Sequence, residues 1–301
     1  MKPGDASLTI FQGSCGDRNA RGYTGASVLG AALSSLLNLP PTVLGQPGPP
    51  LAAECALRAA GPDLRALSLH YQQIMMARAR PIMAANRCAA SIATLPVVAN
   101  HRPDALIIWF DAHGDCNTPE SSTSCYLGGM VLSGASGLWE TGFGNDLKLT
   151  NVILVGARDL DPFEMSLIER TGLNFIPPCH EIGSQLRAKV ASRPVYVHVD
   201  CDVLDPGIVP TEYEVPGGLN LKELFQSAEA LSHSEIVGIE IAEFEGCWPD
   251  GRPGEVGELL SALEPLIVAA SGAYRERQNT SSSRSNNGAP ILDSDDRSRR
   301  A

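Results

Sequence analysis

Short runs of apolar residues alternate with longer segments of helical periodicity along most of the chain. The runs lack polar and apolar alternation, which is typical of strands in a parallel sheet that helices cover on both faces. Strands are expected at Leu8–Phe11, Thr42–Leu44, Pro81–Ala85, Ala105–Phe110, Asn151–Val155, Asn174–Ile176, Val195–Val199 and Glu235–Ile241. Helices are expected at Gly25–Leu37, Pro50–Ala59, Asp63–Arg78, Ala89–Asn100, Pro162–Thr171, Glu181–Ser192, Leu221–Ser232 and Glu255–Ser271.

The pattern predicts one α/β domain over residues 1–273, because neither an internal repeat nor an interdomain linker interrupts it. Asn220 and Glu223 have the spacing of a capping box at the start of one helix. Residues 274–301 are rich in Ser, Asn, Arg and Asp. Such a segment buries too little apolar surface to offset its ordering entropy, so we expect a disordered tail.

Composition narrows the class of protein. Of the 301 residues, 44% are hydrophobic, and no apolar stretch approaches the roughly 20 residues of a membrane span. The first residues lack the basic and apolar regions of a signal peptide, so a cytoplasmic protein is expected. The net charge of −11 argues against nucleic acid as a partner, because its phosphates require basic groups. The eight cysteines include no C-x-x-C pair, which favours reduced thiols.

Potential metal ligands follow two of the expected strands. Asp111, His113 and Asp115 come directly after one strand, and Asp200 and Asp202 come after another. Sites in parallel α/β sheets form at the carboxyl ends of strands, and residues i and i+2 of an extended segment point to the same side. We therefore expect these five side chains to share one crevice.

Four carboxylates and one imidazole are too many anions for a buried pocket without a cation, because unpaired buried charges are very unfavourable. One or two divalent cations are the simplest compensation. Oxygen ligands with some nitrogen suit Mn²⁺ better than a thiolate zinc site.

The same residues resemble the ureohydrolase family of arginase and agmatinase. The motifs are DAHGD at 111–115, DCDVLDP at 200–206 and Glu243 within EIAEFEG, and the resemblance covers about residues 5–272. It implies a single-domain arginase-like fold with an eight-stranded parallel sheet. It also implies two Mn²⁺ ions per subunit, which activate a bridging hydroxide to hydrolyse a guanidino carbon.

The resemblance also implies roles for individual residues. Asp111 and Asp200 would bridge the two ions, His113 and Asp202 would complete the shell of one ion, and Asp115 would bind the other. Glu243 would hold the guanidino group, and Asp115 would also carry the proton to the leaving nitrogen.

The substrate end resembles arginase more than agmatinase. Asp115-Cys116-Asn117-Thr118-Pro119 is similar to the D-x-N-T-P of arginases. The resemblance implies that Asn117, Ser122 and Ser124 bind an α-carboxylate. Asp161 would bind an α-amino group, and Glu164 would assist through water. The expected substrate is therefore a guanidino amino acid.

Two positions depart from the family pattern. Cys88 stands where the family has a metal-binding histidine, and a thiolate can replace that ligand. The neighbouring Arg87 cannot, because a guanidinium has no lone pair to offer. Gly128 stands where arginases carry an acid/base histidine, and its lack of a side chain predicts extra room beside the guanidino group.

Loss of that histidine favours a less basic and more reactive substrate, because general acid catalysis typically contributes about 10²–10⁴-fold. N-hydroxylation makes a guanidine less basic. Together the two departures resemble the hydroxyarginine branch of the family. That resemblance implies hydrolysis of Nω-hydroxy-L-arginine to hydroxyurea and L-ornithine in D-cycloserine biosynthesis.

Two other functions stay open at this point. One is an arginase or another ureohydrolase of guanidino acids, and the other is a non-catalytic metal-binding protein on the same fold. The oligomeric state is open as well: the family is commonly trimeric, but the polar tail offers no interface, so a monomer is an alternative.

Overall fold

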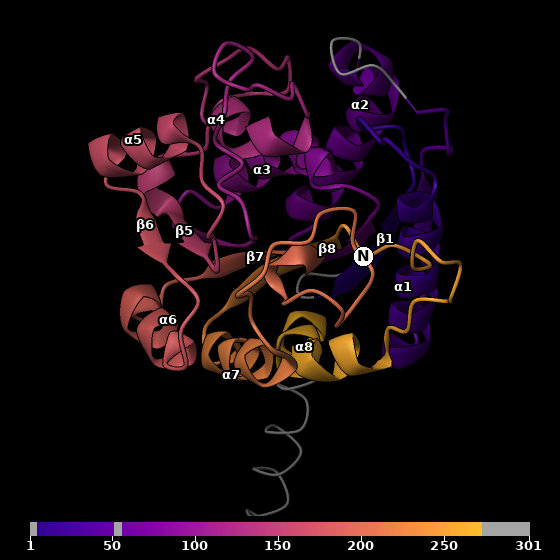
Figure 1. Ribbon diagram of the computed structural model, residues 1–301. Helices are drawn as coiled ribbons and strands as arrows, with labels where there is room; N and C mark the ends of the chain where they lie inside the picture. The colour runs from indigo at the N-terminus through magenta and orange to yellow at the C-terminus, as the bar shows by residue number, and fades with distance from the viewer. Residues whose placement is uncertain (1–4, 51–55, 273–301) are drawn as a thin grey trace, which may run out of the picture.

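Eight parallel strands form one sheet in the computed structural model, which describes residues 5–50 and 56–272 (Figure 1). The order across the sheet is β2-β1-β3-β8-β7-β4-β5-β6, so the last of the described strands lies in the centre. The strands are β1 (Ala6–Phe11), β2 (Thr42–Leu44), β3 (Arg80–Ala85), β4 (Leu106–Phe110), β5 (Val152–Val155), β6 (Asn174–Ile176), β7 (Val195–Asp200) and β8 (Ile236–Ala242). The predicted fold class and all eight predicted strands are confirmed.

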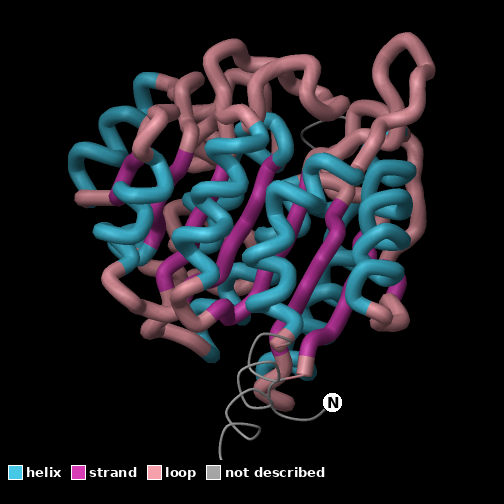
Figure 2. Tube along the Cα trace, turned by 90° about the horizontal axis from the view of Figure 1, so that it is seen from below, coloured by secondary structure: helices cyan, strands magenta, loops and turns pink. Residues whose placement is uncertain are grey.

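Helices cover both faces of the sheet, as Figures 1 and 2 show. Side chains from α2 (Ala56–Met76), α3 (Ser91–His101), α4 (Val131–Ala135) and α5 (Pro162–Thr171) pack in one apolar core. Side chains from α1 (Arg21–Leu37), α6 (Ile182–Val190), α7 (Leu221–Ser232) and α8 (Gly257–Ser271) pack in a second core on the other face. The central strands β3, β4, β7 and β8 are buried, because both cores contact them.

Two predicted helices are in fact one. The sequence predicts separate helices at Pro50–Ala59 and Asp63–Arg78, but α2 runs without interruption through Pro62. Residues 51–55 of the first predicted helix lie outside the described residues. Proline removes one backbone hydrogen bond from a helix interior. The buried stripe of Leu64, Leu67, Tyr71 and Ile74 continues the face begun by Ala60, so tertiary packing outweighs that loss.

Other boundaries shift by a few residues. Helix α1 begins at Arg21 rather than Gly25, and α6 is shorter than expected. The short α4 was not predicted. Among the described residues, four 3₁₀ turns also lie between elements: η2 (Cys88–Ala90), η3 (Gly128–Met130), η4 (Leu149–Asn151) and η5 (Cys201–Val203). The capping box at the start of α7 is confirmed: Asn220 accepts from the Glu223 N–H at 2.9 Å, and Glu223 accepts from the Asn220 N–H.

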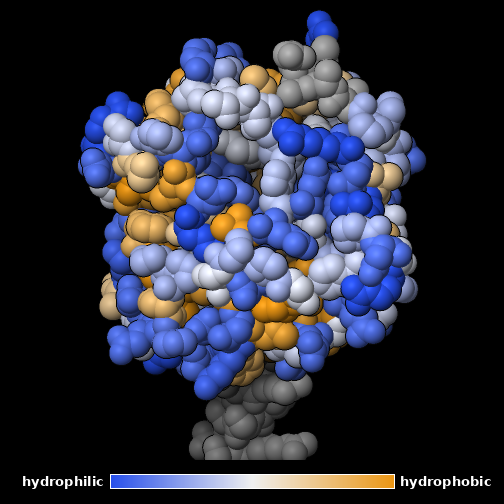
Figure 3. Space-filling view, in the orientation of Figure 1, coloured by the Kyte–Doolittle hydropathy of each residue, from blue (hydrophilic) through white to orange (hydrophobic). Residues whose placement is uncertain are grey.

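The face drawn in Figure 3 is mostly hydrophilic, with apolar residues between polar ones. The exposed large apolar side chains are spread over several elements, among them Leu36 on α1, Leu69 on α2 and Phe225 on α7. None of the described helices is long and apolar enough to cross a membrane. The predicted tail and the predicted domain boundary at 273 lie outside the described residues.

Candidate active site

The carboxyl ends of β4 and β7 bring the two aspartate motifs together. These strands are neighbours, with Phe110 opposite Val199, so the residues that follow each strand meet at one edge. Asp111 is fully buried: its Oδ1 accepts the His113 backbone N–H at 2.7 Å, and its Oδ2 accepts the Trp109 indole N–H at 3.0 Å. These bonds fix the carboxylate before any ligand binds.

His113 joins the two motifs. Its Nδ1 lies 3.2 Å from Asp111 Oδ1 and 3.1 Å from Asp202 Oδ2. Burial alone would lower the pKa of His113, but the hydrogen bonds to the two aspartates raise it to about 12. Asp202 is also tied to the first motif, because its Oδ1 accepts the Ala112 N–H at 3.0 Å. One nitrogen and two carboxylate oxygens thus converge within 4.8 Å of one another, as ligands of one cation would.

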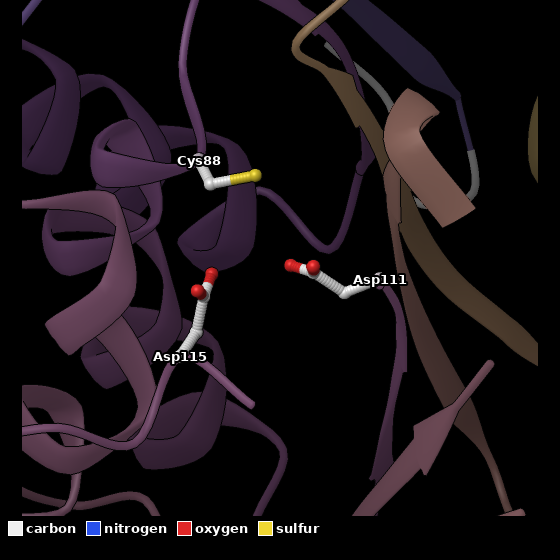
Figure 4. Close-up of side chains that lie close together, drawn as sticks. All are labelled: Cys88, Asp111 and Asp115. Carbon is white, nitrogen blue, oxygen red and sulfur yellow. The ribbon is translucent and has the colours of Figure 1, made fainter. Parts of the chain in front are cut away.

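A third segment, which follows β3, places Cys88 in the same crevice. Cys88 opens η2, and its Sγ lies 2.9 Å from Asp200 Oδ2. Figure 4 shows the thiol and the carboxylates of Asp111 and Asp115 pointing toward a common space. Ligand atoms of these three residues also lie within 4.8 Å of one another, and so do those of Cys88, Asp200 and Glu243.

The charge on these groups suits divalent cations. Burial raises the pKa of Asp115, Asp200 and Asp202, and repulsion from neighbouring carboxylates raises each one further. Burial likewise raises the pKa of the Cys88 thiol well above its usual value, and Asp200 adds to the effect. A bound divalent cation reverses both effects, because it stabilises carboxylates and thiolates. The donor set therefore fits metal ions.

Two of the acidic residues adopt the left-handed backbone region. Asp115 has φ of 49° and Glu243 has φ of 61°. This region is unusual for residues with a Cβ, and its strain concentrates at functional sites. Glu243 follows β8, between β3 and β7, so four adjacent strands supply the crevice.

A cavity of about 210 Å³ extends from the crevice toward the surface. Its lining includes all the predicted substrate contacts, namely Asn117, Ser122, Ser124, Asp161 and Glu164. A larger hollow of about 1070 Å³ lies among the amino ends of β1, β3 and β8. The smaller cavity is the better candidate site, because every group of potential metal ligands found among the described residues borders it.

The predicted substrate contacts differ in what they can offer. Asn117 Nδ2 donates to Asp161 Oδ2 at 2.8 Å, which orients both side chains. The hydroxyl oxygens of Ser122 and Ser124 accept backbone N–H groups, so both O–H groups can donate into the cavity. The carboxylate of Glu164 already binds the backbone: its oxygens accept the N–H groups of Cys116 and Asp161 at 2.9 and 3.0 Å. It shapes the loop as well as lining the cavity.

Comparisons with known proteins identify the family. A sequence model of the arginase family matches residues 49–247, which is more than half of the chain. The chain belongs to the arginase family. Nω-hydroxy-L-arginine amidinohydrolase of Streptomyces lavendulae is 36% identical over 266 residues, which cover 87% of this chain and 97% of that enzyme. Arginase of Bacillus subtilis is 31% identical over 173 residues, which cover 52% of this chain and 58% of that enzyme.

Solved structures confirm the arginase fold. Arginase from Bacillus cereus superposes with a TM-score of 0.74 at 22% identity, over 89% of this chain and 98% of that one. Proclavaminate amidino hydrolase from Streptomyces clavuligerus gives 0.67 at 19% identity, over 90% and 92%. The prediction that the chain is a hydrolase of the arginase family is confirmed.

The departure from the arginase pattern at Gly128 does not leave open space. A Cβ built on Gly128 would lie 2.6 Å from Cε1 of the Tyr126 ring. The extra room predicted there is therefore wrong, because Tyr126 fills it. The Tyr126 hydroxyl lies 3.5 Å from Glu243 Oε1, and Arg18 lies over the ring at 4.9 Å.

His198 is a site residue that the sequence analysis missed. It is fully buried on β7, its Nε2 lies 3.0 Å from Cys88 Sγ, and its Nδ1 lies 3.0 Å from Glu240 Oε1. Its ring stacks on Trp109 at 3.5 Å between centroids. Glu240 is also fully buried and accepts hydroxyl hydrogen bonds from Ser91 and Tyr196. His198 therefore contacts the Cys88 thiol directly, and Glu240 holds the His198 ring in place.

Arg87 is the second residue that sequence reasoning misjudged, because only its inability to bind metal was considered. Its side chain is fully buried, and Nη1 lies 2.8 Å from Glu243 Oε2. Charged residues inside otherwise apolar strands, such as His198 and Glu240 on β7 and β8, were the available signal for a buried polar network.

Proposed function

We propose that this protein hydrolyses Nω-hydroxy-L-arginine to hydroxyurea and L-ornithine with two Mn²⁺ ions per subunit. The match to a hydroxyarginine amidinohydrolase over nearly the full length of both chains supports this substrate. The arginase of Bacillus subtilis aligns over about half of the chain. Cys88 and Gly128 add to the case, because they replace the two histidines of the arginase pattern.

The ligands would divide between two ions as the side chains are grouped. Cys88, Asp111 and Asp115 would hold one ion, and Asp111, His113 and Asp202 would hold the other, because the ligand atoms of each group lie within 4.8 Å of one another. Asp200 lies beside Cys88 and is tied to Asp202, whose N–H donates to Asp200 Oδ1 at 2.8 Å. Asp111 and Asp200 are therefore the residues proposed to bridge the two ions.

Bound metal ions would supply Lewis acidity and a nucleophile derived from water at neutral pH. The oxygen of water forms a bond to the guanidino carbon, and the bond from that carbon to the ornithine nitrogen breaks. Asp115 is proposed to move a proton at its carboxylate to the departing nitrogen. The carbon leaves as hydroxyurea, with the N-hydroxyl and the second nitrogen retained.

The amino-acid end of the substrate would occupy the outer part of the cavity. The O–H groups of Ser122 and Ser124 and the amide of Asn117 can donate to an α-carboxylate. Asp161, which Asn117 holds in place, can accept from the α-ammonium group. A substrate without these groups, such as agmatine, would lose both sets of contacts.

A comparison of three substrates tests the proposal. Purified protein saturated with Mn²⁺ is assayed with Nω-hydroxy-L-arginine, L-arginine and agmatine, and hydroxyurea, urea and the amines are quantified. We expect the highest kcat/KM with Nω-hydroxy-L-arginine. An equal or higher kcat/KM with L-arginine would overturn the specificity and indicate an arginase. Absence of hydrolysis with all three would favour a non-catalytic metal-binding protein.

Metal analysis tests Cys88 separately. After loading with Mn²⁺ and removal of free ions, the native protein is expected to retain two ions per chain. Cys88→Ser should lose much of the bound metal, and Cys88→His should retain it, because histidine is the ligand of the arginase pattern. Cys201→Ser is the matched control, since Cys201 is equally buried and lies between two of the aspartates but in none of the ligand groups. Equal metal content in all four proteins would exclude Cys88 as a ligand.

A further inference from the structure

A guanidinium group of the protein already lies against Glu243. Arg87 is fully buried, and its nitrogens lie 2.8 Å from Glu243, 2.9 Å from Asp17 and 2.9 Å from Glu212. Gly22 on α1 makes room for it, because a Cβ there would lie 3.0 Å from Arg87 Cζ and 3.0 Å from the Asn86 carbonyl oxygen. Arg87 therefore occupies a fitted position inside the protein.

Both carboxylate oxygens of Glu243 already accept hydrogen bonds from the protein. One carboxylate oxygen accepts from Arg87 Nη1 at 2.8 Å, and the other accepts the Cys88 backbone N–H at 2.8 Å. Glu243 lines the substrate cavity and is the residue proposed to hold the guanidino group. Its negative charge is thus shared with a cation that cannot lose its proton in a protein.

We propose that Arg87 is a specificity-determining residue that selects neutral over cationic guanidino groups at Glu243. This inference rests on the proposed function and deepens it. The substrate class is guanidines of lowered basicity, such as N-hydroxyguanidines, of which a larger fraction is neutral near pH 7. Arginine carries its full charge at every pH that the protein tolerates.

The expected size of the effect follows from the distance. A substrate guanidinium on the free side of the Glu243 carboxylate would lie roughly 6–8 Å from the Arg87 guanidinium. At an effective dielectric constant of about 20, the repulsion between Arg87 and a substrate cation at that distance corresponds to roughly 30- to 100-fold in binding. A neutral group would not experience this repulsion.

The competing interpretation is that Arg87 only holds its neighbouring carboxylates together. A purely structural residue would weaken all ligands alike when it is replaced, whereas a charge filter would change their ratio. The inhibition constants of L-citrulline and L-arginine measure that ratio, because citrulline is a neutral analogue of arginine. They are measured as competitors of Nω-hydroxy-L-arginine hydrolysis by the Mn²⁺-loaded protein.

We expect native protein to bind citrulline more tightly than arginine. Arg87→Gln removes the charge and should shift the ratio of the two constants toward arginine by roughly 30- to 100-fold, whereas Arg87→Lys should shift it less. Arg102→Gln is the matched control, because it removes a cation whose partners, Asp104 and Glu235, are not in the lining of the cavity. Arg102→Gln should leave the ratio unchanged.

A second variant covers the risk that Arg87→Gln does not fold. Arg87→Gln with Asp17→Asn removes one positive and one negative charge, so the net charge of the buried cluster stays the same. The same shift is expected, because Glu243 still loses its cation. The native protein provides a test without any variant: tighter binding of arginine than of citrulline would overturn the inference.

The outcomes also separate this inference from the proposed function. Native protein that does not hydrolyse Nω-hydroxy-L-arginine would refute the proposed function. Native protein that hydrolyses it, combined with a ratio that is the same in native and Arg87→Gln proteins, would refute the charge filter alone.

Discussion

The close contact between α1 and the segment after β8 predicts a strong effect of Gly25→Ala. An alanine Cβ at this position would overlap the Phe244 carbonyl oxygen and lie 2.6 Å from its carbon and 3.0 Å from Glu245 Cα. Carbon atoms in contact are normally about 3.5–4.0 Å apart, so the helix must move by about 1 Å or more. The obstacle is backbone and cannot rotate away.

The expected loss combines two opposing effects. Overpacking of a core typically destabilises by about 1–3 kcal/mol and occasionally more. Alanine itself favours a helix by about 1 kcal/mol over glycine. Because the clash is with fixed backbone, we expect an overpacking cost of about 3–4 kcal/mol, at or above the upper end of the usual range, and therefore a net loss of about 2–3 kcal/mol. That loss corresponds to a fall in Tm of roughly 4–12 °C for a domain of this size.

Urea unfolding followed by tryptophan fluorescence measures this loss in the metal-free protein. Gly257→Ala is the control, because Gly257 is also helical but has no atom within 4 Å of an added Cβ. The control is expected to be neutral or slightly more stable. A Gly25→Ala protein as stable as the control would refute the close approach of α1. Since the displaced backbone of Phe244 directly follows Glu243, the KM for Nω-hydroxy-L-arginine should also rise in Gly25→Ala and not in the control.

Three further predictions concern stability. Removing metal with a chelator should lower the urea midpoint, because the buried aspartates repel one another without a cation; an unchanged midpoint would contradict cation binding at the cluster. Burial lowers the pKa of His70 from its usual 6.5, so the unfolded state binds more protons and stability should fall as the pH drops through about 6.5. His70→Gln should flatten that part of the pH profile of unfolding, and an identical slope in both proteins would exclude His70 as its source. Asn220→Ala should destabilise by about 1 kcal/mol in urea unfolding and Asn220→Gly by only a few tenths, because Asn220 caps α7; equal losses would argue against the cap.

The central strands could be predicted from sequence because burial on both faces leaves a local signature. The run Val195–Val199 is apolar except for His198, and β7 extends it by only one residue. The same logic placed potential ligands at the strand ends, where parallel topology collects them. The continuous α2 could not be predicted, since the local preference of Pro62 opposes it and only packing against the core decides the outcome.

Contacts between distant segments left no local signature. The pair Arg87–Glu243, for example, joins residues 156 positions apart. Motif spacing predicts which groups reach the crevice, but it does not predict which protein groups already pair with them. The pairing of Arg87 with Glu243 determines the local charge beside the guanidino group of a bound substrate.

The central place of β8 has a consequence for how the chain folds. This last strand pairs with β3 on one side and β7 on the other, so it joins two part-sheets, β2-β1-β3 and β7-β4-β5-β6. Until it is synthesised, each part-sheet has an exposed edge strand that can pair with other chains. Such long-range pairing also slows folding, because loop closure must come first. A chain that ends before β8 should therefore aggregate rather than form a smaller folded protein.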